Sequence, residues 1–134
     1  MSRKILYTCL LLSNEDQRYI MECFDSFIPK DWKIYCHHMT IRFGDIKETD
    51  DDDLVRFIKE NEGKEFNMKL ISFGESDKAM AVKVETDCPS KNEIKHITIA
   101  VSQNGKPYDS NKIINWRKIN KEILIKGTLT NILQ

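Results

Sequence analysis

The sequence predicts an α+β domain in which two similar halves, each an antiparallel sheet with helices outside, enclose a central groove. Strand-like runs alternate with two helix-like runs along the 134 residues. A four-residue pattern also recurs 58 positions apart, as His38-Met39-Thr40-Ile41 and as His96-Ile97-Thr98-Ile99. Because this length suits one substantial core, we expect a single domain over residues 1–134 with halves related by a pseudo-twofold axis.

The first half begins with a strand and a helix. Residues 4–12 are apolar on both alternating faces, which predicts a central strand that is covered on both sides. Ser13 and Asn14 can cap a helix whose inner face carries apolar residues from Ile20 to Ile28, and Pro29 ends it.

The first copy of the pattern lies in a predicted strand over residues 33–43. Alternation places Met39, Ile41 and Phe43 on one face and His38, Thr40 and Arg42 on the other. A second helix is expected over residues 51–61 and ends near Gly63. The acidic run over residues 48–53 suits the positive N-terminal end of that helix better than a metal site.

The second half is expected to contain mostly strands. Residues 66–73 and 79–85 predict a hairpin joined by the turn at 74–77, and residues 95–102 predict the second motif strand. On that strand His96 and Thr98 lie opposite the apolar face. A short helix is expected near residues 110–115, followed by a final strand over 122–129 with Gly127 as a bulge.

Composition limits the classes of partner. Lys plus Arg and Asp plus Glu each number 21, so there is no global basic field to grip long nucleic acid. No stretch has the length of a transmembrane helix or the pattern of a signal peptide, and the four irregularly spaced cysteines suit free thiols. We therefore expect a cytoplasmic protein without membrane association, while the sequence leaves its oligomeric state open.

The repeated pattern offers the groups needed to cleave a phosphodiester. A His and a Thr two apart on a strand point to the same face, so each copy presents an imidazole and a hydroxyl together. Imidazole acts as acid or base near neutral pH, and hydroxyls donate hydrogen bonds where negative charge builds. We therefore predict His38, Thr40, His96 and Thr98 as a catalytic tetrad that needs no metal or other cofactor. Which histidine is the acid stays open, and two strands whose polar residues merely alternate outward are the alternative.

These residues resemble the two-histidine (2H) phosphoesterase superfamily, whose members carry two His-x-Thr/Ser-x elements with an apolar last residue. The stretches LYTCLLL, HHMTIRFG and HITIAVS, the last followed by GKPYDSN, are more specifically similar to the phage anti-CBASS phosphodiesterases. Those proteins degrade cyclic oligonucleotide messengers and so disarm a bacterial immune pathway. The resemblance implies a bilobal sheet-and-helix fold, metal-independent hydrolysis of 3′–5′ bonds in cyclic di- or oligonucleotides, and action in the host cytoplasm if the protein is phage-encoded.

Five further residues are candidates for holding the substrate. The resemblance implies that Tyr7 stacks on a nucleobase, because the corresponding strand of the family carries a base-stacking tyrosine; a core aromatic is the alternative. Arg42 and Lys83 are candidates to pair with phosphate, and Trp116 is a second candidate for stacking. Glu122 is a candidate acceptor for the edge of a base. Each has a plain alternative as a solvated or core residue.

His37 is expected to point away from the groove, because it is adjacent to His38 on what should be a regular strand. The same alternation divides Cys36, His37 and His38 between two faces, which argues against a zinc site.

Two other functions are compatible with the pattern. One is an RNA-processing or repair phosphodiesterase that acts on terminal 2′,3′-cyclic phosphates. The other is a binding module that sequesters a cyclic nucleotide without cleaving it. Overall neutrality and the anti-CBASS-like stretches argue against the RNA-processing alternative, while the binding module stays open.

Overall fold

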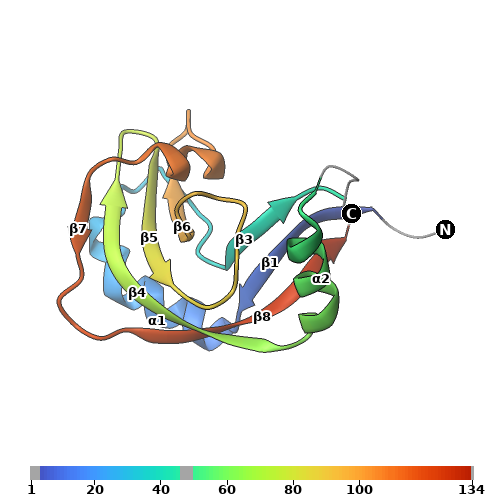
Figure 1. Ribbon diagram of the computed structural model, residues 1–134. Helices are drawn as coiled ribbons and strands as arrows, with labels where there is room; N and C mark the ends of the chain where they lie inside the picture. Colours follow the sequence, from blue (N-terminus) through green and yellow to red (C-terminus); the bar gives the residue numbers. More distant parts are fainter. Residues whose placement is uncertain (1–3, 46–49, 134) are drawn as a thin grey trace.

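The computed structural model describes residues 4–45 and 50–133 and confirms the α+β class (Figure 1). Within these residues eight strands join in one sheet. The elements in chain order are β1 (Ile5–Leu12), α1 (Asn14–Phe24), the 3₁₀ segment η1 (Asp25–Phe27), β2 (Lys33–Ile34), β3 (His38–Phe43), α2 (Asp52–Asn61), β4 (Glu65–Glu75), β5 (Ala79–Glu85), β6 (His96–Val101), the 3₁₀ segment η2 (Pro107–Lys112), β7 (Trp116–Lys118) and β8 (Leu124–Leu133).

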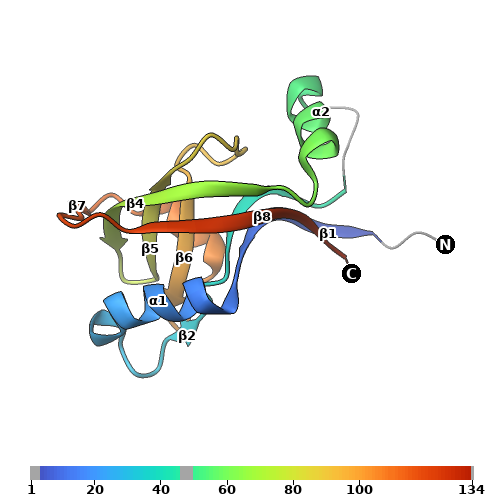
Figure 2. The same cartoon turned by 90° about the horizontal axis from the view of Figure 1, so that it is seen from below.

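The strands form a closed antiparallel barrel. Neighbours follow the order β6-β3-β1-β8-β4-β5, and pairing of β5 with β6 closes the ring. At the margins β2 pairs with β6 and β7 pairs with β4. Figure 2 shows α1 and α2 outside the strands, on opposite sides of them. The closure places the two motif strands, β3 and β6, next to each other through the pair Met39–Ile97.

Capping accounts for the start of α1. The Ser13 hydroxyl accepts a hydrogen bond from the backbone N–H of Asp16 at 3.1 Å, as the sequence predicts. Ile20 and Phe24 are buried and hold the inner face of the helix against the barrel. The α-helix ends at Phe24, and η1 continues the chain toward Pro29, so the predicted helix is α-helical only in its first part.

The second helix, α2, begins after Asp51, whose carboxylate accepts hydrogen bonds from the backbone N–H groups of Asp53 and Leu54. Gly63, at a φ of 85°, lies just past the helix in the left-handed conformation that suits glycine. The predicted helix is therefore confirmed. Residues 46–49, which hold the first part of the acidic run, lie outside the described residues.

Each motif strand, β3 and β6, buries one face in the core and leaves its His-x-Thr pair on the opposite face. Met39 and Ile41 of β3 and Ile97 and Ile99 of β6 are all 0% exposed and belong to the main core cluster. Removing these side chains from water is a large favourable term, about 1.5–3 kcal/mol for each side chain. The alternation predicted for the two patterns is thus confirmed at these positions.

The strand predicted over residues 33–43 is broken into β2 and β3. Between them Cys36 has a φ of 46°, in the left-handed region that non-glycine residues seldom adopt. The broken segment stays bonded to both neighbours, because the Leu12 N–H donates to the His37 carbonyl and the Cys36 N–H donates to the Thr98 carbonyl, each at 2.9 Å. Regular alternation therefore does not extend back from His38 to His37.

A β-bulge in β3 exchanges the two faces after Ile41. Cys9 of β1 is opposite Thr40 and Thr8 is opposite Arg42, so Ile41 is an extra residue on the β3 side. As a result Arg42 is buried at 4% exposure and Phe43 is 58% exposed, the reverse of the prediction.

The C-terminal part of the chain also differs from the prediction. The final strand, β8, pairs with β1 and β4 in continuous register through Gly127, so the bulge predicted there is wrong. A Cβ at Gly127 would lie 2.8 Å from side-chain atoms of Leu10 and Met68, and the glycine therefore allows close approach. The short helix is η2, earlier than expected, and β7 is not predicted. Among the described residues no helix is both long and apolar enough to cross a bilayer.

Candidate active site

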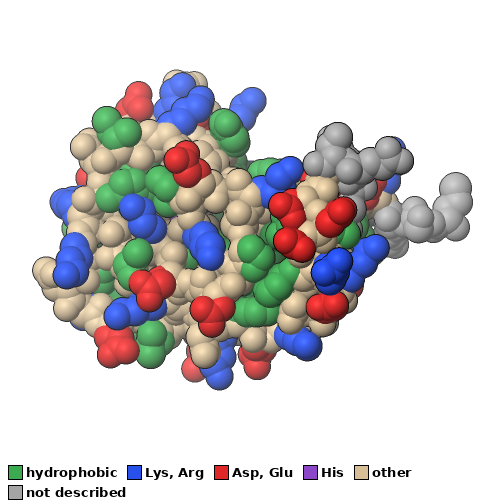
Figure 3. Space-filling model, in the orientation of Figure 1, with side chains coloured by type: hydrophobic (Ala, Val, Ile, Leu, Met, Phe, Trp, Pro, Cys, Tyr) green, Lys and Arg blue, Asp and Glu red, His purple; other side chains and the backbone are tan. Residues whose placement is uncertain are grey.

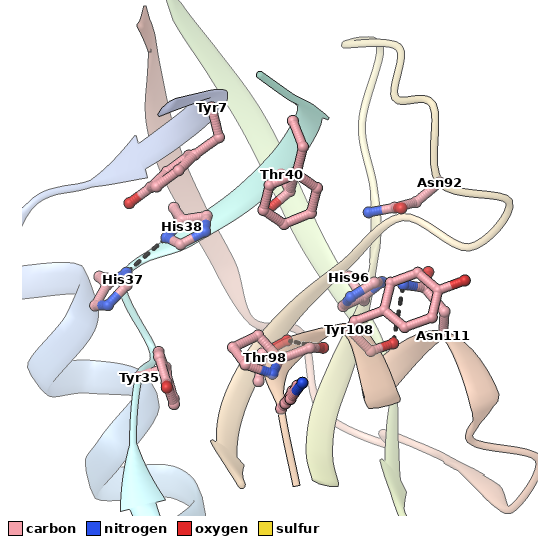
Figure 4. Close-up of a pocket in the computed structure, with 13 residues that line it drawn as sticks. Tyr7, Tyr35, His37, His38, Thr40, Asn92, His96, Thr98, Tyr108 and Asn111 are labelled. Carbon is pink, nitrogen blue, oxygen red and sulfur yellow. Dashed lines mark hydrogen bonds between the residues drawn. The ribbon is translucent and has the colours of Figure 1, made fainter. Parts of the chain in front are cut away.

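A cavity of about 280 Å³ opens beside the two motif strands (Figure 4). All four residues of the predicted tetrad line it. Its walls come from β1, β3, β6, the segment before β3 and the loops on either side of β6, which lie far apart in the sequence. The lining residues are Tyr7, Tyr35, His37, His38, Thr40, Phe43, Asn92, His96, Thr98, Lys106, Pro107, Tyr108 and Asn111.

His96 is held by the backbone. It is 5% exposed, and its Nδ1 lies 2.8 Å from the carbonyl oxygen of Ile94. A carbonyl only accepts, so Nδ1 carries the hydrogen and Nε2 is the nitrogen available to the cavity. Burial lowers the pKa of His96, and the hydrogen bond to Ile94 opposes that decrease. The ring is therefore fixed in orientation while its Nε2 can accept or donate a proton.

His38 is held by side chains instead. Its Nδ1 lies 2.6 Å from Nδ1 of His37, and the ring of Tyr7 stacks on its other side with centroids 4.7 Å apart. Burial lowers the pKa of His38 to about 4, with further decreases from the neighbouring charges of His37 and His96. His96, on the neighbouring strand, is thus one of the groups that lower the pKa of His38.

The two threonine hydroxyls have different surroundings. The Thr98 Oγ1 lies 2.8 Å from the hydroxyl of the fully buried Ser110 and 3.4 Å from the Pro107 carbonyl. The Thr40 hydroxyl makes no hydrogen bond within the described part of the chain, although its backbone carbonyl accepts one from Ser90 at 2.8 Å. Both hydroxyls line the cavity, and that of Thr40 is free to donate to a ligand.

The expectation that His37 points away from the groove is wrong. His37 lines the same cavity and contacts His38, because the left-handed turn at Cys36 removes the alternation on which that expectation depended. The doublet of histidines was visible in the sequence, but the turn that brings both rings to one side was not.

Aromatic rings surround the tetrad. Tyr7 lines the cavity, as predicted for a base-stacking residue, and its stacking partner in this structure is His38. Tyr35, Phe43 and Tyr108 also line the cavity and were not predicted. Phe43 and Tyr108 are 58% and 60% exposed, so their rings form part of an open rim. The available signal was that Tyr35 and Phe43 flank the first motif and that Tyr108 lies in the GKPYDSN stretch.

Arg42 does not line the cavity. Its guanidinium forms a buried ion pair with Asp50 at 2.9 Å, and a second nitrogen donates to the Gly44 carbonyl. The bulge at Ile41 turns Arg42 to the face opposite the tetrad, so Arg42 is not among the cavity-lining residues. Lys91, 3.2 Å from the same carboxylate, joins the pair and fastens the loop that carries Asn92.

The other three predicted binding residues also lie outside the cavity lining. Lys83 is opposite His96 on β5, but its ammonium group lies 4.9 Å from the ring centroid of Trp116. Trp116 packs beside a small core cluster and donates its indole N–H to the Ile113 carbonyl at 3.1 Å. Glu122 is exposed in the segment before β8. All three residues therefore have the positions expected of solvated or core residues, which was the alternative to substrate binding.

The charge around the cavity suits an anion. Among the described residues, Lys106 lines the cavity and no Asp or Glu does. Elsewhere, the face in Figure 3 shows Lys and Arg interspersed with Asp and Glu, without a broad basic field. Within the described residues no group of three His, Cys, Asp or Glu side chains is placed to hold a metal ion. The four cysteines are free, and burial raises the pKa of the Cys36 thiol to about 12.

Comparison with known proteins yields neither a matching family model nor a matching curated protein. The geometry of the site is what supports a functional proposal: two imidazoles and two hydroxyls line one small cavity with aromatic walls and a nearby lysine.

Proposed function

We propose that the protein is a metal-independent phosphodiesterase that opens cyclic di- or oligonucleotides by hydrolysing a 3′–5′ bond, with His38 and His96 as its acid–base pair. The observation that carries this proposal is that both His-x-Thr pairs, 58 positions apart in the sequence, line one cavity. Because β3 pairs with β6 through Met39 and Ile97, the two pairs lie on the same face of adjacent strands, and the cavity lies against that face.

The cavity provides what an in-line displacement at phosphorus requires. One neutral imidazole takes the proton from the attacking oxygen, while the protonated imidazole gives a proton to the leaving oxygen. Thr40 and Thr98 donate hydrogen bonds to the non-bridging oxygens, whose negative charge increases in the transition state. If the buried Ser110 hydroxyl donates to Thr98, the single hydrogen of Thr98 is directed to the Pro107 carbonyl at 3.4 Å, and it can turn from this long contact to a phosphate oxygen.

The size and wall of the cavity support a nucleotide substrate. A volume of about 280 Å³ is at the lower end of ligand pockets, which span roughly 300–1,000 Å³. It accommodates one phosphate with its adjoining sugar better than a whole cyclic ring. The rest of the ring would lie over the exposed rings of Phe43 and Tyr108, where base stacking contributes about 1–3 kcal/mol per base.

The proposal includes membership of the 2H superfamily and its two-lobed arrangement. In that arrangement β8, β1 and β3 form one lobe and β4, β5 and β6 form the other. The lobes meet where β3 lies beside β6, and each contributes one motif strand at the seam. The similarity of the motif stretches to anti-CBASS phosphodiesterases supports cyclic oligonucleotide messengers as substrates and the host cytoplasm as the place of action.

The test is incubation with a panel of cyclic di- and trinucleotides in EDTA, followed by chromatography of the products. Linear products support the proposal. Binding without any cleavage would instead identify a module that sequesters the ligand, and cleavage restricted to RNA with 2′,3′-cyclic phosphate ends would identify an RNA-processing enzyme.

A matched variant makes that test specific to the site. In His96→Asn the amide N–H can still donate to the Ile94 carbonyl, but the nitrogen that faces the cavity is lost. We expect this variant to fold and to form linear product at no more than about 1% of the wild-type rate. General acid–base catalysis contributes about 10²–10⁴-fold, so its loss accounts for a decrease of this size. Cleavage at the wild-type rate would contradict the proposed role of His96.

A further inference from the structure

The contact between His37 and His38 is a hydrogen bond between two rings in nearly the same plane. The Nδ1 atoms are 2.6 Å apart, whereas the ring centroids are 4.7 Å apart and the planes differ by 20°. A nitrogen separation so much shorter than the centroid separation means that the rings meet along their edges. Figure 4 shows this pair with a dashed line and the far edge of His38 turned toward Thr40.

Only a proton fits between these two nitrogens. Two ligands of one tetrahedral zinc ion would be separated by roughly 3.3 Å, since each Zn–N bond is about 2.0–2.1 Å. The two Nδ1 atoms cannot both carry hydrogen at this distance, because the hydrogens would collide, and they cannot both be bare without repulsion of their lone pairs. One ring donates and the other accepts.

The position of the shared proton sets the chemistry of His38. When the Nδ1–H of His38 donates to His37, a neutral His38 presents a bare Nε2 to the cavity and is a base. When His37 donates, a neutral His38 carries its hydrogen on Nε2, so it can only donate a hydrogen bond there and cannot take a proton from the attacking oxygen. His96 has no such choice, because the Ile94 carbonyl keeps hydrogen on its Nδ1 in every state.

We propose that His37 is a positioning residue that accepts the Nδ1 proton of His38, making His38 the general base and leaving His96 as the general acid. This inference rests on the proposed function and assigns the two roles within it. The groups facing His38 agree: the titratable or charged cavity residues are Tyr7 from β1, His37 before β3, His96 from β6, and Lys106 and Tyr108 from the segment around η2. No carboxylate that would favour a charged His38 lines the cavity in the described part of the chain.

The proton movements balance in one turnover. The O–H bond of the attacking water or ribose hydroxyl breaks, its proton goes to Nε2 of His38, and the new P–O bond forms. The Nδ1 proton of His38 moves to Nδ1 of His37, so the positive charge resides on the pair. The P–O bond to the leaving oxygen breaks, and that oxygen takes the Nε2 proton of His96. The Nδ1 proton then returns from His37 to His38, the Nε2 proton of His38 passes to solvent, and solvent returns a proton to Nε2 of His96, which restores the starting state.

The first experiment needs no substrate. Nitrogen-15 NMR of the imidazoles in the free, full-length protein reports which ring nitrogens carry hydrogen at neutral pH. We expect His38 to have hydrogen on Nδ1, with a signal broadened or shifted by sharing with His37, and to change its tautomer in His37→Phe. A His38 with hydrogen on Nε2 only, or a tautomer unaffected by His37→Phe, would overturn the inference whether or not the protein cleaves cyclic nucleotides.

The second experiment follows kcat/KM against pH with a cyclic dinucleotide for three proteins. His37→Phe keeps an aromatic ring beside Tyr35 but offers no acceptor, and we expect the rate to fall by up to about 10²-fold, the cost of misplacing a catalytic group. The acidic limb of its profile should move, because the imidazole that shares the Nδ1 proton of His38 and affects the pKa of His38 is gone. His37→Asn, whose carbonyl oxygen can accept from Nδ1, should recover part of the rate.

These outcomes separate the two claims. Wild-type cleavage with an unchanged pH profile in both His37 variants overturns the role of His37 and leaves the phosphodiesterase intact. A shifted limb with recovery in His37→Asn supports the role, since a residue that only fills space would not move the profile. Absence of cleavage by the wild-type protein contradicts the proposed function, and the NMR result then decides the tautomer alone.

Discussion

The two copies of the four-residue pattern lie on adjacent strands, yet their histidines are supported in different ways. In β6, His96 is buried and its Nδ1 donates to a backbone carbonyl, which fixes where the ring carries hydrogen. In β3, His38 is half-buried, stacks on Tyr7 and shares a hydrogen bond with another imidazole. An imidazole can donate or accept, whereas a carbonyl can only accept. The two histidines therefore need not carry hydrogen on the same ring nitrogen, although their motifs are alike. The hydrogen-bond partner of Nδ1 determines which nitrogen carries it.

The two threonine hydroxyls also differ in their hydrogen-bond partners. Thr98 is held by Ser110 and the Pro107 carbonyl, which belong to the segment that folds back over β6. The Thr40 hydroxyl has no protein partner among the described residues. The β6 copy is thus tied into the fold, while the β3 copy keeps its groups free for a ligand.

Removing either imidazole is the change with the largest expected effect. His38→Ala and His96→Ala should each lower kcat/KM for a cyclic dinucleotide by about 10²–10⁴-fold, because each takes away one proton transfer. Steady-state rates measured beside thermal unfolding of both variants test this. Lys83→Met is the control, since Lys83 lies on the strand beside β6 but outside the cavity lining, and it should retain most activity. Full activity in both alanine variants would dispose of the tetrad.

Local signals predicted the parts of the fold that depend on local chemistry. The Ser13 cap and the alternation of Met39 and Ile41 are properties of a few neighbouring residues, and the structure contains them. The turn at Cys36 and the bulge at Ile41 depend instead on how β3 registers against β1 and β6. No pattern within the strand itself carries that information.

These two irregularities account for the errors at the site. The turn at Cys36 brings His37 into the cavity, and the bulge removes Arg42 from it and admits Phe43. Lys106 and Tyr108 reach the cavity because η2 packs against β5 and β6, a long-range contact that composition does not reveal. The tetrad was predictable because it lies where both strands are regular.

Exchanging the threonines for valine sharpens the comparison between the two copies. Thr40→Val should lower kcat/KM by about 10²-fold, the low end of the effect of removing one donor to a developing charge, and leave stability nearly unchanged. Thr98→Val should lower activity similarly and also destabilise the fold by about 1–3 kcal/mol, because the buried Ser110 hydroxyl loses its partner. Denaturant unfolding beside kinetics measures both. Equal stability of the two variants would contradict the asymmetry.

The smallest expected effect is a difference in how stability depends on pH. His38 has a folded-state pKa of about 4 against an ordinary value of 6.5, so between these pH values the unfolded chain binds a proton that the folded chain does not. Acid therefore favours unfolding in this window, and stability rises with pH by at most about 1.4 kcal/mol per pH unit for one such group. Burial lowers the pKa of His37 and His96 as well, which adds slope of the same sign.

Replacing one histidine at a time shows how much each one contributes to the dependence of stability on pH. His38→Phe keeps a ring against Tyr7 and should flatten the dependence of the unfolding free energy on pH between about 4 and 6.5. His96→Asn should flatten it less, because the hydrogen bond to Ile94 already opposes the effect of burial on the pKa of His96. Urea unfolding at several pH values measures both slopes. A larger change of slope in His96→Asn than in His38→Phe would mean that the hydrogen bond to Ile94 does not stabilise the charged form of His96. The pKa of His96 would then be lowered more than that of His38, contrary to the comparison drawn above.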